Sequence, residues 1–217
     1  MRVRLFLTPI LWLLAAAPAR ADFDAGMAAY EGGDFKQAMY EWRPLAEAGD
    51  AEAQYRVGRL YGFGEGVDDD KSRALYWYRL ASEQNHSAAT YNLGVYHRKG
   101  WSVSKSERIA TAYYTRAAAL GDTSAMYNLG VNLWEGDGVK QSDATAFKWF
   151  KKAGEEGQPD AQNYLGLAYS SGRGVEENQE KEVYWYTRGA SQGDTIAQGA
   201  LAYHYMAGEG IIADPVA

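Results

Sequence analysis

Residues 123–158 read TSAMYNLGVNLWEGDGVKQSDATAFKWFKKAGEEGQ, and this stretch recurs along the chain with a period of 36 residues. A shift by one period aligns residues 51–86, 87–122, 123–158 and 159–194 without a gap, and a partial copy follows at residues 195–217. Such self-similarity is typical of solenoids, in which each repeat buries its apolar face against its neighbours. The sequence therefore predicts a repeat protein.

Helix breakers and caps divide each copy into two helices. Glycine occupies position 14 in every copy, and a second glycine follows two residues later except at Ser102. Position 20 always holds a residue whose side chain can cap a helix N-terminus, namely Asp70, Ser106, Ser142, Asn178 and Asp214. These signals predict helix A over positions 1–13, a loop, and helix B over positions 21–33, so the chain is expected to be all-α.

The glycines at position 8 of helix A predict close packing between the two helices. A glycine inside a helix costs about 1 kcal/mol relative to alanine, so its recurrence needs an offsetting gain. Large rings at positions 27 and 28 of helix B, such as Trp149 and Phe150, can lie over the bare surface at Gly130. Positions 3, 4, 7, 8 and 11 are expected to be buried, and positions 2, 6, 9 and 13 to face away from them.

The motif closely resembles Sel1-like repeats, which are relatives of the tetratricopeptide repeat. The residues that carry the resemblance in one copy are Ala125, Tyr127, Leu129, Gly130, Gly136, Gly138, Val139, Trp149, Phe150 and Ala153. The resemblance implies a right-handed α/α superhelical solenoid and a role as an adaptor in protein complexes. It also implies an exported bacterial protein that regulates a membrane sensor or assists envelope assembly.

Positions 6 and 9 of helix A are the predicted protein-binding positions, because their identity varies between otherwise similar copies. They are Arg56, Asn92, Asn128 and Tyr164 at position 6, and Arg59, Val95, Val131 and Leu167 at position 9. In the related tetratricopeptide fold the A helices line the concave surface and asparagines hold a bound peptide's backbone. That analogy favours Asn92 and Asn128 as peptide contacts, with solvated surface polarity as the alternative.

The two ends of the repeat array depart from the pattern. Residues 22–50 predict a shorter helix pair that caps the stack. At the other end, Asp214-Pro215 has the signature of another helix B start, and helix A over residues 195–207 would lack an aromatic partner. The chain is thus expected either to be a truncated form of a longer repeat protein or to offer an apolar edge, with Tyr203, Tyr205 and Met206 partly uncovered, through which it self-associates.

The first 21 residues have the features of a signal peptide. Basic residues precede an apolar run over residues 5–17, and small residues precede the expected cleavage site after Ala21. The run is shorter than the about 20 residues of a membrane span, which makes a permanent anchor the weaker alternative. The mature protein is therefore expected to be periplasmic or secreted, with no membrane insertion.

Charge and the absence of cysteine restrict the partners. Cleavage would remove Arg2, Arg4 and Arg20, leaving 19 basic and 28 acidic residues and a net charge of −9. Such a chain repels phosphate backbones, so no nucleic-acid partner is expected. The lack of cysteine excludes disulfides and thiolate metal sites and agrees with export.

Catalytic and metal-binding motifs are weak. Ser102 and Lys105 match S-x-x-K and leave a β-lactamase-like or peptidoglycan-active hydrolase as the alternative function, but no S-D-N or K-T-G element accompanies them. The three histidines lack metal-binding spacing, and Asp68-Asp69-Asp70 suits a helix N-terminus better than a calcium loop. The sequence therefore favours a non-enzymatic scaffold without cofactor or metal, whose partner is a protein or peptide.

Overall fold

The computed structural model describes residues 22–207, in which every regular element is an α-helix. The helices are α1 (Phe23–Glu31), α2 (Phe35–Glu47), α3 (Ala51–Phe63), α4 (Lys71–Glu83), α5 (Ser87–Lys99), α6 (Glu107–Ala119), α7 (Thr123–Glu135), α8 (Asp143–Glu155), α9 (Pro159–Ser171), α10 (Gln179–Ser191) and α11 (Thr195–Ala207). From α3 onward, odd-numbered helices are the A helices and even-numbered ones the B helices, with the bounds that the repeat predicts. The expected signal peptide and the motif at Asp214-Pro215 lie outside the described residues.

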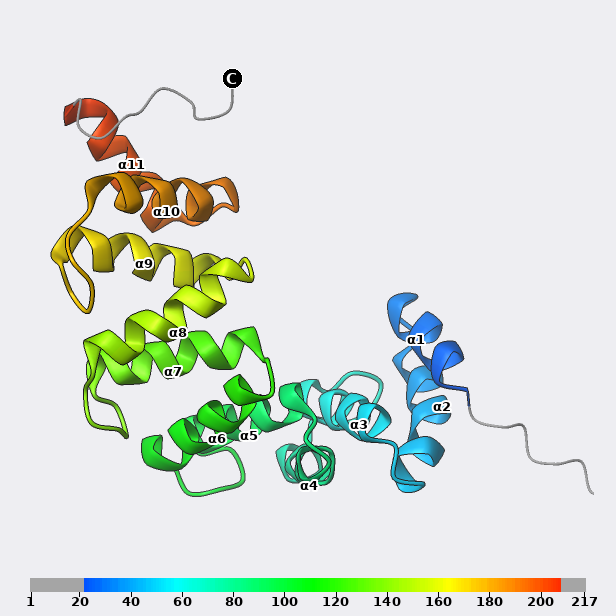
Figure 1. Ribbon diagram of the computed structural model, residues 1–217. Coiled ribbons are helices and arrows are strands. Elements are labelled where there is room, and N and C mark those ends of the chain that lie inside the picture. Colours follow the sequence, from blue (N-terminus) through cyan, green and yellow to red (C-terminus); the bar gives the residue numbers. More distant parts are fainter. Residues whose placement is uncertain (1–21, 208–217) are drawn as a thin grey trace, which may run out of the picture.

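The helices stack in chain order into an open arc. From α3 to α9, each A helix packs most extensively on the B helix of its own repeat, and each B helix packs on the next A helix. Figure 1 shows the arc, with a hollow between the arm that holds α1 and α2 and the arm that holds α7 to α11. At the bend, α3 and α5 border this hollow and α4 and α6 lie on its outer side.

The position-8 glycines allow the two helices of a repeat to touch, as predicted. A Cβ on Gly130 would lie 2.6 Å from the Phe150 ring, and one on Gly94 would lie 2.5 Å from the Tyr114 ring. Both rings are fully buried. The ring at position 28 makes this contact in each full repeat, and Trp42 of α2 packs in the same way on Gly26 of α1.

The loops after the A helices anchor each repeat to the preceding B helix. A Cβ on Gly66 would lie 2.7 Å from the backbone of Phe35, at the start of α2. Ser102 has a φ of 55°, and its Oγ lies 3.1 Å from the Ser72 Oγ of α4. A left-handed backbone is strained for a serine, but it gives this loop the same conformation that Gly66, Gly138 and Gly174 give the other loops.

Buried side-chain amides join successive repeats. Gln54 donates to the Ala46 carbonyl of α2 at 3.1 Å, and Gln162 donates to the Gly154 carbonyl of α8 at 2.9 Å. The Oε1 of each glutamine accepts a hydrogen bond, from Gln84 and Gln192 respectively. A buried amide with partners on both sides fixes the register between helices because a slip would leave it unsatisfied.

The buried face of helix A includes one position more than predicted. Position 10, which the sequence analysis does not include, is buried in all five copies: Leu60, Tyr96, Asn132, Ala168 and His204. Each A helix from α3 to α9 packs against a B helix on either side, so its buried stripe is wider than the stripe that a single neighbouring helix would cover. Within residues 22–207 no helix is long and apolar enough to cross a bilayer.

Candidate protein-binding surface

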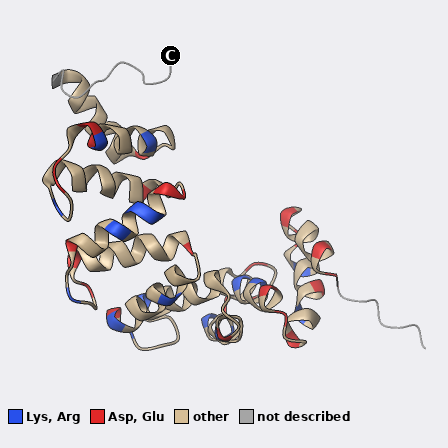
Figure 2. Cartoon of the chain, viewed as in Figure 1, with Lys and Arg blue, Asp and Glu red and all other residues tan. Residues whose placement is uncertain are grey.

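The A helices of the C-terminal half are almost without charge. Glu135 and Asp160 are the only Asp, Glu, Lys or Arg residues of α7, α9 and α11. The neighbouring helices α8 and α10 carry several charges of both signs, as Figure 2 shows. Because both kinds of helix have solvent-facing positions, this contrast marks the A-helix side as chemically distinct.

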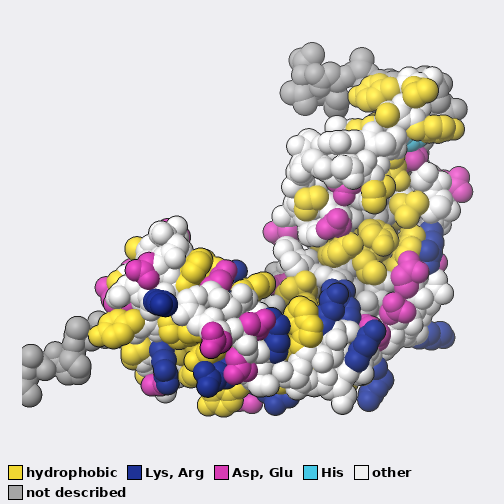
Figure 3. Space-filling model, turned by 180° about the vertical axis from the view of Figure 1, so that it is seen from behind, with side chains coloured by type: hydrophobic (Ala, Val, Ile, Leu, Met, Phe, Trp, Pro, Cys, Tyr) yellow, Lys and Arg dark blue, Asp and Glu magenta, His cyan; other side chains and the backbone are white. Residues whose placement is uncertain are grey.

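Hydrophobic side chains of the A helices form a continuous layer that is only partly covered. We define the A surface as Tyr91, Val95, Tyr127, Val131, Tyr164 and Leu167. All except Leu167 are half-buried and pack against the core, and Leu167 is 43% exposed. The space-filling view in Figure 3 shows hydrophobic side chains gathered on this half of the molecule.

The predicted residues at positions 6 and 9 are more buried than expected. Tyr164 stacks on Phe150 with ring centroids 4.6 Å apart and meets Tyr127 edge-on at 5.9 Å. Val95 and Val131 pack against the core. Adjacent A helices lie close enough that each covers part of its neighbour, so these positions are partly closed by the next repeat.

The two predicted arginines are held by contacts inside the chain. Arg56 Nε donates to Glu52 Oε1 at 2.7 Å, and Arg59 Nη2 donates to the Tyr30 hydroxyl at 3.2 Å. His86 also donates to Glu52, at 2.8 Å from its Nε2. The hydrogen bonds from His86 and Arg56 lower the pKa of Glu52 against the opposing effect of burial.

The two predicted asparagines differ in burial. Asn92 is half-buried, and its Nδ2 donates to the Ala88 carbonyl of its own helix at 3.0 Å. Asn128 is only 7% exposed, so the expectation of an exposed position is wrong. Its Nδ2 donates to the Ser124 carbonyl at 2.8 Å and its Oδ1 accepts from Arg98 at 2.8 Å, and its burial limits the access of a peptide backbone to the remaining donor and acceptor.

Arg98 is the residue of this surface that the sequence analysis overlooks. It lies at position 12 of α5, and its side chain reaches across to Asn128 of α7. Its guanidinium also lies 5.7 Å from the centre of the Tyr114 ring. The predicted binding face comprises positions 6 and 9 and leaves out position 12. Yet residue identity at position 12 also varies between the repeats, which have Gly62, Arg98, Trp134 and Ser170 there.

Burial changes the ionisation of the tyrosines around Arg98. It raises the pKa of Tyr127 to about 12, with nearby carboxylates adding to the rise and Arg98 opposing it. It likewise raises the pKa of Tyr91 and Tyr114, again with Arg98 opposing. These hydroxyls are therefore neutral in the physiological range and provide no counter-charge for the guanidinium.

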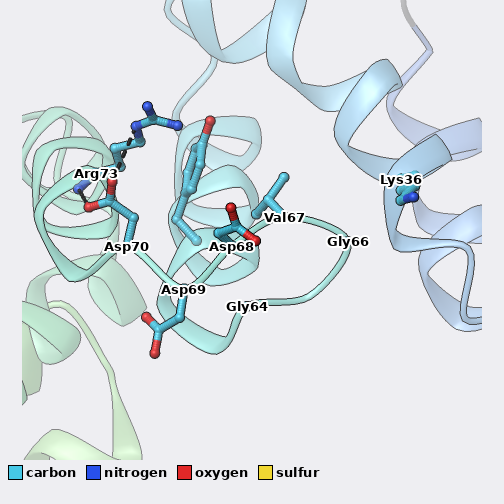
Figure 4. A pocket seen from close by; sticks show the side chains of 9 residues that line it. Lys36, Gly64, Gly66, Val67, Asp68, Asp69, Asp70 and Arg73 are labelled. Carbon is cyan, nitrogen blue, oxygen red and sulfur yellow. Dashed lines mark hydrogen bonds and ion pairs between the residues drawn. The ribbon is translucent and has the colours of Figure 1, made fainter.

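A second hollow lies at the loop between α3 and α4. It has a volume of about 690 Å³, and Figure 4 shows Asp68, Asp69 and Asp70 along one side and Lys36 across from Gly66. Asp70 caps α4, accepting from the backbone N–H groups of Ser72 and Arg73 at 3.0 and 2.9 Å. The acidic run thus acts as the N-cap that the sequence predicts.

The loop after α5 shows no catalytic arrangement. Ser102 Oγ bonds to Ser72, and the described structure gives no hydrogen bond between Ser102 and Lys105. Trp101 is 40% exposed, meets Tyr96 edge-on at 5.4 Å and lies 5.2 Å below the Lys71 ammonium of the preceding repeat. Trp101 is therefore partly covered by its own repeat and by the preceding one.

No group of three His, Cys, Asp or Glu side chains within residues 22–207 is arranged to hold a metal ion.

A cavity of about 530 Å³ between α9, α10 and α11 is lined by His204 and Glu182, which form a buried hydrogen bond of 3.0 Å. Glu182 stands where the other full repeats have alanine, and its hydrogen bond joins α10 to α11.

The chain is similar to solved structures of Sel1 repeat proteins, among them two that are at least 30% identical to it. A protective antigen of uropathogenic Escherichia coli strains with an SLR fold is 35% identical with a TM-score of 0.76, over 80% of this chain and 37% of that protein. A Sel1 repeat protein from Oxalobacter formigenes is 30% identical with a TM-score of 0.82, over 88% of this chain and 78% of its own. The chain thus spans just over a third of the Escherichia coli protein.

Cysteine rich protein B of Helicobacter pylori, at 23% identity and a TM-score of 0.50 over 61% of this chain and 96% of its own, shares the fold. No curated protein matches the chain. The Sel1 repeat model matches residues 51–86, 87–122, 123–158, 159–194 and 195–217. The chain therefore belongs to the Sel1 repeat family, whose members are in general protein–protein interaction scaffolds.

Proposed function

We propose that this chain is a non-enzymatic scaffold that binds a segment of a partner protein along the A surface. The observation that carries the proposal is the charge contrast between the helices. Solvent-facing helices of a monomeric protein gain solubility from charged residues, as α8 and α10 show. A partly apolar surface with few charges beside them is what a docking partner would cover.

The construction of the surface also suits peptide binding. Its aromatic rings are fixed by packing against the core, so little side-chain freedom is lost when a ligand binds. Tyrosine offers both an apolar ring and a polar tip, the combination enriched in protein interfaces. Because residues from α5, α7 and α9 contribute, an extended segment would contact several repeats at once.

We further propose that the protein acts outside the cytoplasm, in the periplasm or after secretion, and regulates an envelope complex or sensor. The support is the signal-like sequence of residues 1–21 together with the lack of cysteine. The proposed partner is thus a protein of the same compartment.

Site-specific photocrosslinking tests the binding surface. A photoreactive phenylalanine analogue is placed at Leu167 on α9, which is 43% exposed, and in a second variant at Tyr184 on α10, which is 50% exposed. We expect a discrete partner adduct in living cells from position 167 and none from position 184. The two positions are similarly exposed, but only position 167 lies on the A surface. Equal adducts from both positions, or adducts from position 184 alone, would contradict binding on the A surface.

A further inference from the structure

Arg98 is a half-buried cation that no carboxylate of residues 22–207 pairs with. Some arginines of the described chain pair with acids, such as Arg56 with Glu52 at 2.7 Å and Arg173 with Asp143 at 3.0 Å, whereas Arg59, like Arg98, has a neutral partner. Within the described residues the only hydrogen bond of the Arg98 side chain is the one from Nη1 to Asn128, although a guanidinium has five N–H donors. The chain itself therefore leaves most of this group's bonding capacity unused.

The guanidinium is nevertheless held in place. Asn128 accepts from it while its own amide nitrogen is fixed by the Ser124 carbonyl, and Asn128 is buried. The Tyr114 ring packs beside the guanidinium at 5.7 Å. A preoriented arginine loses less side-chain freedom when it binds an anion than one that is free in solvent.

Two buried polar atoms at this point have no partner among the described residues. They are the Tyr114 hydroxyl, on a residue that is fully buried, and the Arg98 Nε. An unsatisfied buried polar group costs roughly 1–3 kcal/mol, so such groups in a native protein call for an explanation. Both atoms are enclosed, so an anion would not reach them; it would bind at the outer edge of the guanidinium and provide the counter-charge that the described residues do not supply.

We infer that Arg98, held by Asn128, binds the carboxylate of an Asp or Glu side chain within the partner segment. This inference rests on the proposed function and specifies the partner's chemistry. A carboxylate matches the planar donors of a guanidinium, and the neutral tyrosines around it do not compete as counter-charges.

An internal side chain fits the site better than a chain terminus. The A helices continue on both sides of Arg98, with α3 before α5 and with Tyr127, Val131 and Leu167 after it, so a bound segment can run through the site. Packed helices lie roughly 10 Å apart and an extended chain advances roughly 3.3 Å per residue. The partner should therefore carry an apolar residue about three positions from its acidic one.

The net charge of the chain makes this contact selective. At −6, or −9 after the expected cleavage, the protein repels acidic segments in general. An acidic residue in the partner is thus favourable only where it meets Arg98, and misplaced acids are disfavoured.

Panning a library of displayed peptides tests the inference. The full mature chain is used to select random 12-residue segments that are embedded between fixed flanking sequences, so that no free terminus is offered. We expect the selected peptides to share an Asp or Glu with an apolar residue about three positions away. Replacing that acid with its amide in a synthetic, terminally blocked peptide should weaken binding roughly tenfold or more.

Matched protein variants assign the effect to Arg98. Arg98→Gln should lose the preference for the acid over its amide, whereas Arg79→Gln, at an exposed position of α4, should retain it. Replacing the acid of the peptide with its amide leaves the protein unchanged. This comparison therefore tests the inference even if Arg98→Gln folds poorly. Selected peptides without an acidic preference, or an unchanged preference in a folded Arg98→Gln variant, would overturn the inference while leaving the A surface as the binding site. Failure to select any peptide would count against the proposed function itself.

Discussion

Single glycines determine how closely the helices of each repeat approach. At Gly130 any side chain would enter the space of the Phe150 ring, which is fully buried and cannot move aside. Gly199 on α11 is different, because a Cβ there would meet nothing within 4 Å. The two glycines occupy the same kind of helix and so form a matched pair.

We predict opposite effects of substituting these two glycines. Gly130→Leu should destabilise the fold by about 1–3 kcal/mol or more through overpacking. Gly199→Ala should stabilise α11 by about 0.5–1 kcal/mol through helix propensity. Urea denaturation followed by circular dichroism measures both, and a Gly130→Leu variant as stable as the parent would refute the packing described here.

Glu52 gives a pH dependence at the residue scale. Its pKa lies below the ordinary value of 4.5, chiefly because His86 donates to it and because Arg56 does so as well. A carboxylate with a lowered pKa stabilises the fold fully above the unfolded value and loses this contribution as the pH falls through the folded value.

We therefore predict that Glu52→Gln reduces the melting temperature at neutral pH and that this deficit shrinks as the pH is lowered below about 4.5. The effect should be modest because the Glu52 side chain is 41% exposed. Glu47→Gln, which alters an exposed pair with Arg43, serves as the control. A deficit that does not depend on pH would show that the Glu52 charge is not responsible.

At the scale of the helix, the sequence predicts where elements begin and end but not which side chains reach across to the next repeat. Helix bounds follow from local signals, such as the Asp70 cap and the left-handed glycine Gly64, and the structure confirms them. The contact between Arg98 and Asn128 depends on the distance between α5 and α7, which no local pattern contains. For that reason Asn128 was predicted to be exposed and Arg98 was overlooked.

A buried hydrogen bond that has no equivalent in the other repeats attaches the last described helix, α11, to α10. Glu182 of α10 bonds to His204 of α11 at 3.0 Å, and both are buried. The equivalent of Glu182 is alanine in the other full repeats, at Ala74, Ala110 and Ala146, and the equivalent of His204 in the preceding repeat is Ala168. The pair thus occurs where α11 packs mainly on one helix, α10.

We predict that Glu182→Ala destabilises the attachment of α11 by about 1–3 kcal/mol, because it leaves a buried imidazole without a partner. The double variant with His204→Ala gives the two positions small apolar side chains, as at Ala146 and Ala168, and should lose less than the two single variants together. Amide hydrogen exchange resolved along α11 measures both. Strictly additive effects would mean that the two side chains do not act as a pair.

At the scale of the whole molecule, the stack is built from contacts between neighbours and gives its two ends unequal surfaces. The buried hydrophobic side chains form two clusters, one from α2 to α5 and one from α6 to α10, and buried amides such as Gln162 fix the register between repeats. Towards α11 the apolar side chains are no longer covered by described residues: Ile196 is 67%, Tyr203 67%, Tyr205 63% and Met206 89% exposed. This agrees with the uncovered helix that the repeat pattern predicts.

We expect this apolar edge to mediate self-association of the chain, since a contiguous exposed apolar patch on a soluble protein marks an interaction surface. Replacing Tyr203 and Met206 with glutamate should abolish any concentration-dependent increase in sedimentation coefficient, because a charge at each position would have to be desolvated in the contact. Tyr76→Glu on α4, at an aromatic residue that is 56% exposed, is the matched control and should sediment like the parent. Helicity should not change in either variant, because these side chains make few contacts within the chain. A parent protein that is monomeric at all concentrations would refute the expectation and would show that α11 closes the stack without a partner.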